Sequence, residues 1–391
     1  MEFRFSKKEE LLQWAVNDFA QRELAANKFD TLDHIPEEII RKIGELGFFS
    51  MRIPEKYEGE PATWVMIGIL AEEMAKANIS IANLIMVSYG VSISLSTNGT
   101  EEAKEEWLPK LVKGEKLGCI SMTEPDSGSD VFSIQTKAIR KDDIYLLSGE
   151  KSMVSFGSQV DVALLFARTS IEKESNGVTA FLVPLNLPGV TKLPIIGMGL
   201  LPSRPASLVL NGVSIPVEYR IGQEGEGLHI NRSMGLFSDL SRVLSGLISL
   251  GFAQTAMKSA IAYGKKRFAF GRPVVQFEAI SEKIAEDATL IEAGRWLCYR
   301  ALWLKDQNLP NTKEAAMCGW WCPKVAFQAI EDALLIHGHS GYSEDLPFQQ
   351  MLRDVMAFEM MAGTEEILKL TVAQNVIGKA ALPVNLSDHF D

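Results

Sequence analysis

The chain has 391 residues, 47% of them hydrophobic, and a formal net charge of −11. This length allows about two or three domains with large buried cores, and the negative charge argues against nucleic acid or an anionic membrane surface as the main partner. The first residues contain no apolar signal core, and no run of about 18 apolar residues follows. We therefore expect a cytoplasmic protein without membrane insertion.

The spacing of apolar residues predicts three consecutive regions. Residues 1–118 indicate helices, including an amphipathic one in GTEEAKEEWLPKLVKG that we expect to end at Pro109 and Gly114. Residues 119–226 contain short alternating or β-branched runs separated by turn residues, which is typical of a small antiparallel barrel or sandwich. Residues 227–391 return to long, apolar helices that pack in a bundle. The predicted fold class is α+β, with one domain in each region.

The four cysteines, Cys119, Cys298, Cys318 and Cys322, are too few and too apolar in their surroundings for a disulfide framework. Cys318 and Cys322 lie one helical turn apart in CGWWC, with no histidine near them in sequence. We expect core thiols in a reducing compartment.

Two glycine-containing segments could bind an anion. In MTEPDSGSD, residues 122–130, Gly128 lies between two serines whose hydroxyl and backbone N–H groups could hold a phosphate or a carbonyl oxygen, although an ordinary polar turn has the same composition. In KKRFAFGRP, residues 265–273, the basic cluster could complement a helix C-terminus or hold a pyrophosphate. Locally the helix C-terminus is the favoured interpretation.

Two further segments need an explanation. His337 and His339 could ligate a metal, but no third ligand follows at a suitable spacing, which disfavours that interpretation. The stretch RDVMAFEMMAGTEEILKL, residues 353–370, indicates two helices separated by an uncharged break at 360–363, with Thr364 as the expected cap of the second helix.

Taken together, these segments resemble the acyl-CoA dehydrogenase family. The resemblance extends from LGFFSMRIPEKYEGE (46–60) to GTEEILKL (363–370), and ISMTEPDSGSD (120–130) and GHSGYSEDLPFQQMLRD (338–354) are its most specific matches. It implies an N-terminal helical domain, a central β-barrel and a C-terminal four-helix bundle. It also implies FAD between the last two domains, in dimers or in tetramers built from dimers, with part of each FAD site supplied by a neighbouring subunit.

The resemblance also assigns roles by position. Thr123 would bond the edge of the flavin ring, Ser129 would face FAD and the pantetheine arm, and Ser155 would reach the ring near N5. Met153 replaces a shielding tryptophan. The complete set of implied FAD contacts is Met122, Thr123, Ser129, Met153, Ser155, Arg267, Phe270, Thr364 and Glu366. The implied substrate contacts are Ser129, Asp239 and Arg242. Two glutamines usual at the adenine side are replaced by Glu278 and Leu335.

The resemblance is incomplete at the catalytic base. Family members remove the α-proton of a thioester with a glutamate, and Ala362 stands at that position here. The alternative family position for this glutamate holds Ser241. The remaining candidates are Tyr89 and Asp239, since Glu359 matches an acidic residue that family members keep alongside their base. A lost general base typically costs ~10²–10⁴-fold in rate. We therefore expect ordinary dehydrogenation of a plain fatty acyl-CoA not to be the main activity.

The functional expectation is an FAD-dependent oxidoreductase that acts on an acyl thioester, carried by CoA or by an acyl carrier protein, with non-standard chemistry. Three alternatives stay open: elimination or desulfination of an acyl-CoA, flavin-dependent oxygen or alcohol chemistry, and a non-catalytic thioester-binding or assembly protein. The implied electron acceptor is an electron-transfer flavoprotein or oxygen.

Overall fold

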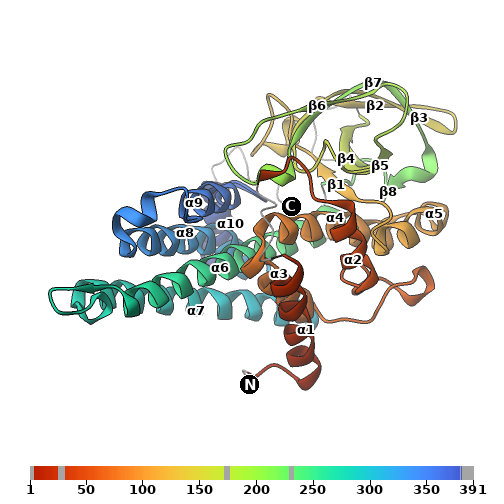
Figure 1. Cartoon of the computed structure of the whole chain (residues 1–391). Helices are drawn as coiled ribbons and strands as arrows, with labels where there is room; N and C mark the ends of the chain where they lie inside the picture. The colour runs from red at the N-terminus through yellow and green to blue at the C-terminus, as the bar shows by residue number, and fades with distance from the viewer. Residues whose placement is uncertain (1–3, 25–30, 171–176, 229–232, 379, 381–391) are drawn as a thin grey trace.

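The computed structural model describes residues 4–24, 31–170, 177–228, 233–378 and 380. A β-domain lies over a layer of helices that come from both ends of the chain (Figure 1). The two longest helices of the C-terminal region extend away from this body and meet in a turn at its far end. The predicted order of helices, sheet and helices is confirmed, and so is the α+β class.

The N-terminal helices are α1 (Lys7–Glu23), α2 (Glu37–Glu45), α3 (Trp64–Ala77), α4 (Ile79–Asn98) and α5 (Glu101–Val112). Helix α4 begins where the Asn78 side chain accepts the backbone N–H of Ile81 at 3.0 Å. By length and composition α4 alone, among the described helices, passes as a membrane span, but 94% of its apolar window is buried inside the protein. It is therefore a core helix in this fold.

The prediction that Pro109 ends its helix is wrong. Helix α5 continues to Val112 with Pro109 inside it, and Gly114 follows with φ +70°. Proline disfavours a helix interior because it lacks an N–H donor and crowds the preceding turn. Here Trp107, Leu108 and Leu111 are all buried, so packing of the apolar face outweighs that penalty.

The β-domain is a mixed sheet with the strand order β6-β7-β3-β2-β4-β5-β8, in which β1 pairs with β4. Most pairs are antiparallel, but β1 runs parallel to β4, and β2 meets β4 in parallel at one position. The long strands β3 and β7 pair with two register shifts, the second between Lys151 and Val154. The strands are β1 (Gly118–Ser121), β2 (Lys137–Lys141), β3 (Ile144–Val154), β4 (Val162–Arg168), β5 (Val178–Pro184), β6 (Val190–Pro194), β7 (Ala206–Pro216) and β8 (Arg220–Ile221).

The C-terminal region is a bundle built on α6 (Ser233–Lys266), α7 (Glu278–Asp306), α8 (Thr312–Ile336) and α10 (Glu365–Ile377). The short helix α9 (Phe348–Met356) lies between α8 and α10, and a small hairpin of β9 (Phe268–Ala269) and β10 (Arg272–Pro273) lies at the turn between α6 and α7. The buried Glu72 of α3 accepts hydrogen bonds from Arg295 and from Tyr299, both on α7. This contact ties the bundle to the N-terminal helices.

The cysteines are buried free thiols, as predicted. Cys298 of α7 and Cys322 of α8 have their sulfur atoms 3.7 Å apart. A Cβ atom added at Gly246 of α6 would lie 3.0 Å from the Cys298 sulfur. The thiols therefore fill a close helix crossing as small apolar groups.

One buried carboxyl group gives a testable pH dependence. Asp287 of α7 is 2% exposed, and its Oδ2 has no hydrogen-bond partner among the described residues. Burial, with a smaller contribution from Asp332, raises its pKa from 3.8 to about 6. A raised carboxyl pKa means that the folded chain binds the proton more tightly than the unfolded chain, so stability is lost as the pH rises through about 6.

We expect Asp287→Asn to raise the free energy of unfolding by about 1–2 kcal/mol at pH 8, after allowance for solvent screening, and to have little effect near pH 4. Urea unfolding at several pH values measures the difference. Glu286→Gln, at the exposed neighbouring position, is the matched control and should show no such rise. An Asp287→Asn effect that does not change with pH would contradict the assignment.

Candidate active site

Two segments of the β-domain, the loop after β1 and the end of β3, present the side chains expected to face the flavin. The Ser152 N–H donates to the Thr123 carbonyl at 2.8 Å, which fixes the loop against the strand. Thr123 and Ser129 are exposed, and Ser155 is half-buried. The structure therefore brings the predicted contacts Met122, Thr123, Met153 and Ser155 together on one edge of the domain.

The end of β3 leaves regular strand geometry where these side chains are needed. Met153 has φ +53° and Phe156 has φ +58°, a left-handed conformation that non-glycine residues rarely adopt. The register shift between Lys151 and Val154 accompanies this change. As a result the Met153 side chain is turned outward and is 57% exposed, although it is large and apolar. Strained backbone of this kind is concentrated at functional sites.

A series of hydrogen bonds connects this edge to the C-terminal region. The Phe156 N–H donates to the Ser203 carbonyl at 2.6 Å, and the Leu200 N–H donates to Asp354 Oδ1 of α9, also at 2.6 Å. Arg353 donates to the Met198 carbonyl at 2.6 Å. The loop 195–205 therefore holds the end of β3 at a fixed position relative to α9 and to the segment that follows α9.

The break in the sequence after α9 lies in that segment. A single 3-10 turn, Ala357–Glu359, follows α9, and α10 begins at Glu365. Ala362 has φ +58° and Gly363 has φ +115°, so the chain reverses there in a conformation that favours glycine. The Arg242 Nε of α6 donates to the Ala362 carbonyl at 3.2 Å. The predicted base position and the predicted substrate residue Arg242 are therefore in contact.

Arg242 belongs to a buried polar cluster. Its guanidinium donates to Asp239 Oδ1 at 3.1 Å, and the Thr312 hydroxyl donates to Asp239 Oδ2 at 2.7 Å. Burial lowers the pKa of Arg242, and the neighbouring Asp239 opposes this effect. Both predicted substrate contacts on α6 are held in place by this cluster, with Asp239 only 7% exposed.

Thr364 is the N-cap residue of α10, as predicted, but its side chain makes no capping hydrogen bond. Thr364 has the extended backbone of an N-cap residue, φ −69° and ψ 161°, but its hydroxyl accepts no capping hydrogen bond. Its side chain is therefore not satisfied by the helix that it precedes. Glu366 is exposed on the first turn, and the neighbouring Glu365 is paired with Lys324 and Lys369.

The hydroxyl groups of Ser241 and Tyr89, two of the predicted alternatives to the missing glutamate, are poorly suited to accept a proton. The Ser241 hydroxyl is buried and donates to the Ser238 carbonyl of its own helix at 2.9 Å. Tyr89 is 2% exposed, and burial raises its pKa far above the ordinary value, so its phenol stays protonated. Glu359 is half-buried, and burial raises its pKa, which makes its carboxylate a stronger base than that of an exposed glutamate.

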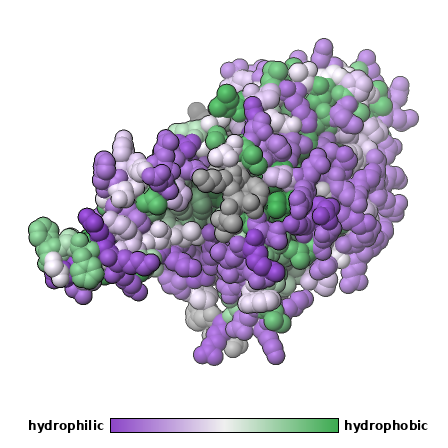
Figure 2. All heavy atoms as spheres, viewed as in Figure 1, coloured by the Kyte–Doolittle hydropathy of each residue, from purple (hydrophilic) through white to green (hydrophobic). Residues whose placement is uncertain are grey.

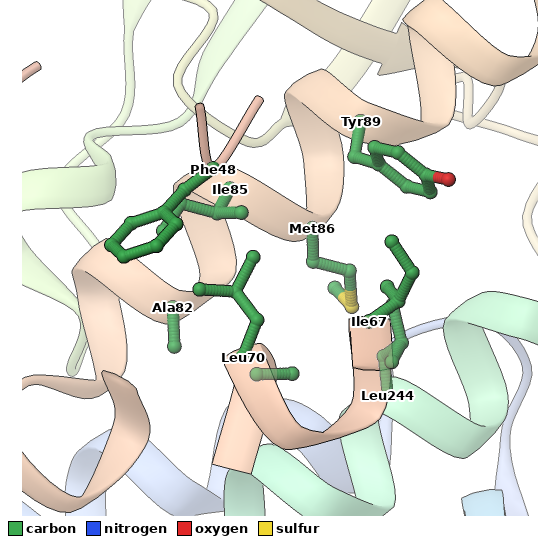
Figure 3. A pocket seen from close by; sticks show the side chains of 9 residues that line it. Phe48, Ile67, Leu70, Ala82, Ile85, Met86, Tyr89 and Leu244 are labelled. Carbon is green, nitrogen blue, oxygen red and sulfur yellow. The ribbon is translucent and has the colours of Figure 1, made fainter. Parts of the chain in front are cut away.

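A small apolar cavity borders α6 at Leu244. It has a volume of about 10 Å³, room for about one water molecule. Figure 3 shows Met86, Ile67 and Leu244 around it, with the Tyr89 hydroxyl directed away from the other labelled side chains. That hydroxyl has no hydrogen-bond partner in the described part of the chain. The lining is Phe48, Ile67, Leu70, Ala71, Ala82, Ile85, Met86, Tyr89 and Leu244.

Arg267 and Phe270, which the resemblance assigns to the FAD of a neighbouring subunit, lie away from the other predicted FAD contacts. Both lie at the turn between α6 and α7, at the end of the molecule where hydrophobic atoms gather on the face shown in Figure 2. Phe270 is 97% exposed and has φ +50°. Leu335, which replaces a family glutamine, is 55% exposed at the end of α8.

His337 has a packing role in this region. Its ring stacks on Tyr263 with centroids 4.4 Å apart, and its Nδ1 lies 2.8 Å from the Ala333 carbonyl. It is 4% exposed. The paired neighbour expected for a metal site, His339, is exposed on the following turn.

Side chains of the β-domain and of the segment 360–364 are suited to contact a flavin dinucleotide. Met153 and Met360 are large apolar side chains left 57% and 64% exposed, as is suitable for covering a flat ring. A Cβ atom added at Gly128 would meet nothing within 4 Å, so a ligand can approach the loop closely. Because the Thr364 side chain does not cap α10, the first N–H groups of that helix remain available to a diphosphate.

A helical domain, a β-domain and a helical bundle in this order are the arrangement that the sequence resemblance predicts for a flavoprotein oxidoreductase. Comparison with known families gives the particular family. The chain matches the acyl-CoA dehydrogenase N-terminal domain over residues 6–115, the middle domain over 119–213 and the C-terminal domain over 230–377. It therefore belongs to the acyl-CoA dehydrogenase family. Members are FAD-dependent oxidoreductases of acyl-CoA, and FAD is the cofactor.

Individual relatives agree along nearly the whole chain. A probable acyl-CoA dehydrogenase of Bacillus subtilis (strain 168) is 34% identical, covering 96% of this chain and 100% of the relative. A glutaryl-CoA dehydrogenase of Desulfococcus multivorans is 33% identical, with 97% and 98% covered. The structure of butyryl-CoA dehydrogenase from Megasphaera elsdenii superposes with a TM-score of 0.92 at 30% identity, covering 96% of this chain and 100% of that one.

Two residues of the site, Lys151 and Glu124, were not predicted from the sequence. Lys151 is 0% exposed and donates to the Met122 carbonyl at 2.8 Å and to Glu124 Oε1 at 2.7 Å. The sequence does indicate that Lys151 is buried. It is separated from Tyr145 and Leu147 by even numbers of residues, so all three side chains are expected on the same, buried face of β3. A charged residue at an inward-facing strand position requires a buried partner.

Proposed function

We propose that this chain oxidises an acyl thioester with a short, uncharged acyl group, and that residue 362 takes no proton in the reaction. Ala362 carries the argument, because a methyl side chain cannot accept the α-proton. The contact from Arg242 to the Ala362 carbonyl supports the view that the segment keeps its usual place, with only the carboxylate missing. The domain boundaries near residues 118 and 226 and the roles of the flavin-facing residues belong to the same proposal.

The cavity supports the choice of acyl group. Its side chains are apolar apart from the single phenol of Tyr89, so no charged group is available there to pair with a carboxylate at the end of the acyl chain. The glutaryl-CoA dehydrogenase relative is named for an acyl group that carries such a carboxylate. About 10 Å³ leaves little room without movement of the lining, and Met86 is the most adaptable of these side chains.

The chain's own residues bind and orient the substrate. Asp239 and Arg242, fixed by each other and by Thr312, hold the thioester arm beside α6. Met153 and Met360 shield the reacting face from water. When FAD is bound, it supplies the capacity to accept a hydride from the acyl chain. Because neither residue 362 nor residue 241 is a carboxylate, the proposed substrate releases its α-proton easily or reacts without losing it.

Two alternative reactions would also be consistent with an alanine at position 362. An elimination or desulfination expels a leaving group from the acyl chain and needs no strong base, and an oxygenase or alcohol-oxidising reaction starts at a different atom. In this proposal the acyl group is carried by CoA or by an acyl carrier protein, and the electron acceptor is an electron-transfer flavoprotein or oxygen. A non-catalytic thioester-binding protein is the remaining alternative. The exposed turn around Phe270 supports a homo-oligomer, a dimer or a tetramer, in which this turn reaches the FAD of a neighbouring chain.

The test is anaerobic mixing of the FAD-loaded protein with saturated acyl-CoAs of several lengths. We expect flavin reduction to be ~10²–10⁴-fold slower than for a family member that has its glutamate. The same mixtures, with and without oxygen, are then searched by mass spectrometry for dehydrogenated, eliminated and oxygenated products. Rapid bleaching of the flavin by a plain acyl-CoA would contradict the proposal, and the absence of any product would favour the non-catalytic alternative.

A further inference from the structure

We propose that Lys151 positions the flavin-facing loop by holding the Met122 carbonyl, and that Glu124 keeps the lysine in place. The inference rests on the proposed flavin contacts of Met122 and Thr123. Neither Lys151 nor Glu124 is needed to touch FAD or substrate. Lys151 is a positioning residue, and its effect on the cofactor passes through the backbone of the loop.

The geometry around Lys151 is closed. Its ammonium group is completely buried, with the Met122 carbonyl at 2.8 Å and Glu124 Oε1 at 2.7 Å. Burial, more than these contacts can offset, lowers its pKa to about 8. Burying a charged group away from solvent has a large desolvation free energy, and apolar residues of similar volume often fill such positions with equal or greater stability. The need to fill the core therefore does not by itself explain a lysine here.

Glu124 anchors the other side of the same loop. Its carboxylate accepts the Gln135 N–H at 2.7 Å and the Thr136 N–H at 3.0 Å, from the two residues that precede β2. Its backbone forms a tight turn, since the Glu124 N–H donates to the Ser127 carbonyl at 2.8 Å. Glu124 is thus fixed both to the sheet and to the serine-glycine part of the loop.

Thr123 lies between these two fixed points. The Met122 carbonyl before it is held by Lys151, and Glu124 after it is held by the residues that precede β2. The carbonyl of Thr123 itself accepts the Ser152 N–H at 2.8 Å. Both peptide groups that flank Thr123 are therefore fixed from β3, whose next residue is Met153. The buried ammonium group of Lys151, together with the Ser152 N–H, thus fixes the position of the loop relative to β3. The loop and the end of β3 are the two segments proposed to face the flavin.

Three variants separate positioning from general stability. Lys151→Met removes the cation while keeping the side-chain volume, and it leaves Glu124 charged and the Met122 carbonyl unpaired. The double variant Lys151→Met/Glu124→Gln removes both charges, and the single amide oxygen of the glutamine keeps an acceptor for either Gln135 or Thr136, which donate to different oxygens of Glu124. Arg295→Met breaks the Glu72 ion pair of α3 and α7, which is also buried but lies among the helices. The measurements are thermal stability, the dissociation constant of FAD by fluorescence titration, and the shape of the bound flavin absorption band.

We expect the single variant Lys151→Met to lose stability and FAD affinity together. The double variant should regain most of the thermal stability and still bind FAD about tenfold more weakly than wild type, with an altered absorption band. Arg295→Met should lose stability with an unchanged FAD dissociation constant and band.

Recovery of FAD affinity and spectrum along with stability in the double variant would overturn the inference, because the ion pair would then be structural only. An equal loss of affinity in Arg295→Met would overturn it too. Wild-type protein that binds no FAD would overturn the proposed cofactor site as well. Normal FAD binding by both wild type and the double variant would leave that site intact and reject the role of Lys151 alone.

Discussion

Ala362→Glu is expected to increase the rate of flavin reduction by a saturated acyl-CoA by ~10²–10⁴-fold, the usual contribution of a positioned general base. The backbone at this position already supports a side chain, since Ala362 has φ +58° with its Cβ in place, so glutamate adds no new class of backbone strain. The neighbouring Gly363, with φ +115°, keeps the turn unchanged. Stopped-flow absorbance under anaerobic conditions measures the rate.

Ala362→Gln is the matched control, because it has nearly the same shape but cannot accept the proton. It should leave the rate at the wild-type level. If glutamate and glutamine behave alike, the 362 side chain does not reach the α-carbon, and the proposed relation between this turn and the substrate is wrong. A gain restricted to glutamate would show that the rest of the site is intact for dehydrogenation.

Arg242→Met is expected to have the largest effect on stability, a loss of about 3–5 kcal/mol in the free energy of unfolding. The variant removes the ion pair of the buried Asp239 carboxylate, which keeps its hydrogen bond from the Thr312 hydroxyl, and it leaves the Ala362 carbonyl without the bond from Arg242. The side chains of Arg242 and Asp239 are 14% and 10% exposed, so solvent cannot replace the lost contacts. Urea unfolding of the FAD-loaded protein measures the loss.

Arg300→Met provides the comparison. Arg300 pairs with Glu314 at 2.6 Å but its side chain is 55% exposed, so removing it should cost less than about 1 kcal/mol. The double variant Arg242→Met/Asp239→Asn should recover part of the loss, because no uncompensated charge remains. Equal effects of the Arg242 and Arg300 changes would mean that the Arg242 cluster is solvated.

Regular periodicity made the fold predictable. The change from helical spacing to short alternating runs near residue 119, and back again near 227, reflects how many faces of each element are buried. Pro109 was mispredicted because local propensity favours a helix end at proline. The buried side chains around it are stabilised by tertiary packing, which a local sequence pattern does not reveal. The parallel pairing of β1 with β4 is likewise a long-range contact.

The candidate site was predictable where a motif identifies it and not where geometry decides. The loop 122–130 and the turn at 362–363 were found from residue types, but whether the Thr364 side chain bonds to α10 depends on a side-chain direction. Lys151 and Glu124 are adjacent only because β3 and the loop after β1 pack together, although they are separated by many residues. Ser241 illustrates the same limit, since only the structure shows its hydroxyl bonded to Ser238.

The exposed turn between α6 and α7 has a consequence for handling the protein. In the proposed oligomer the Phe270 side chain, 97% exposed in the single chain, contacts the cofactor held by a neighbour. A ligand shared by two chains links its own affinity to their association by mass action. Dilution would then release flavin and dissociate subunits in the same concentration range, and added FAD would oppose both.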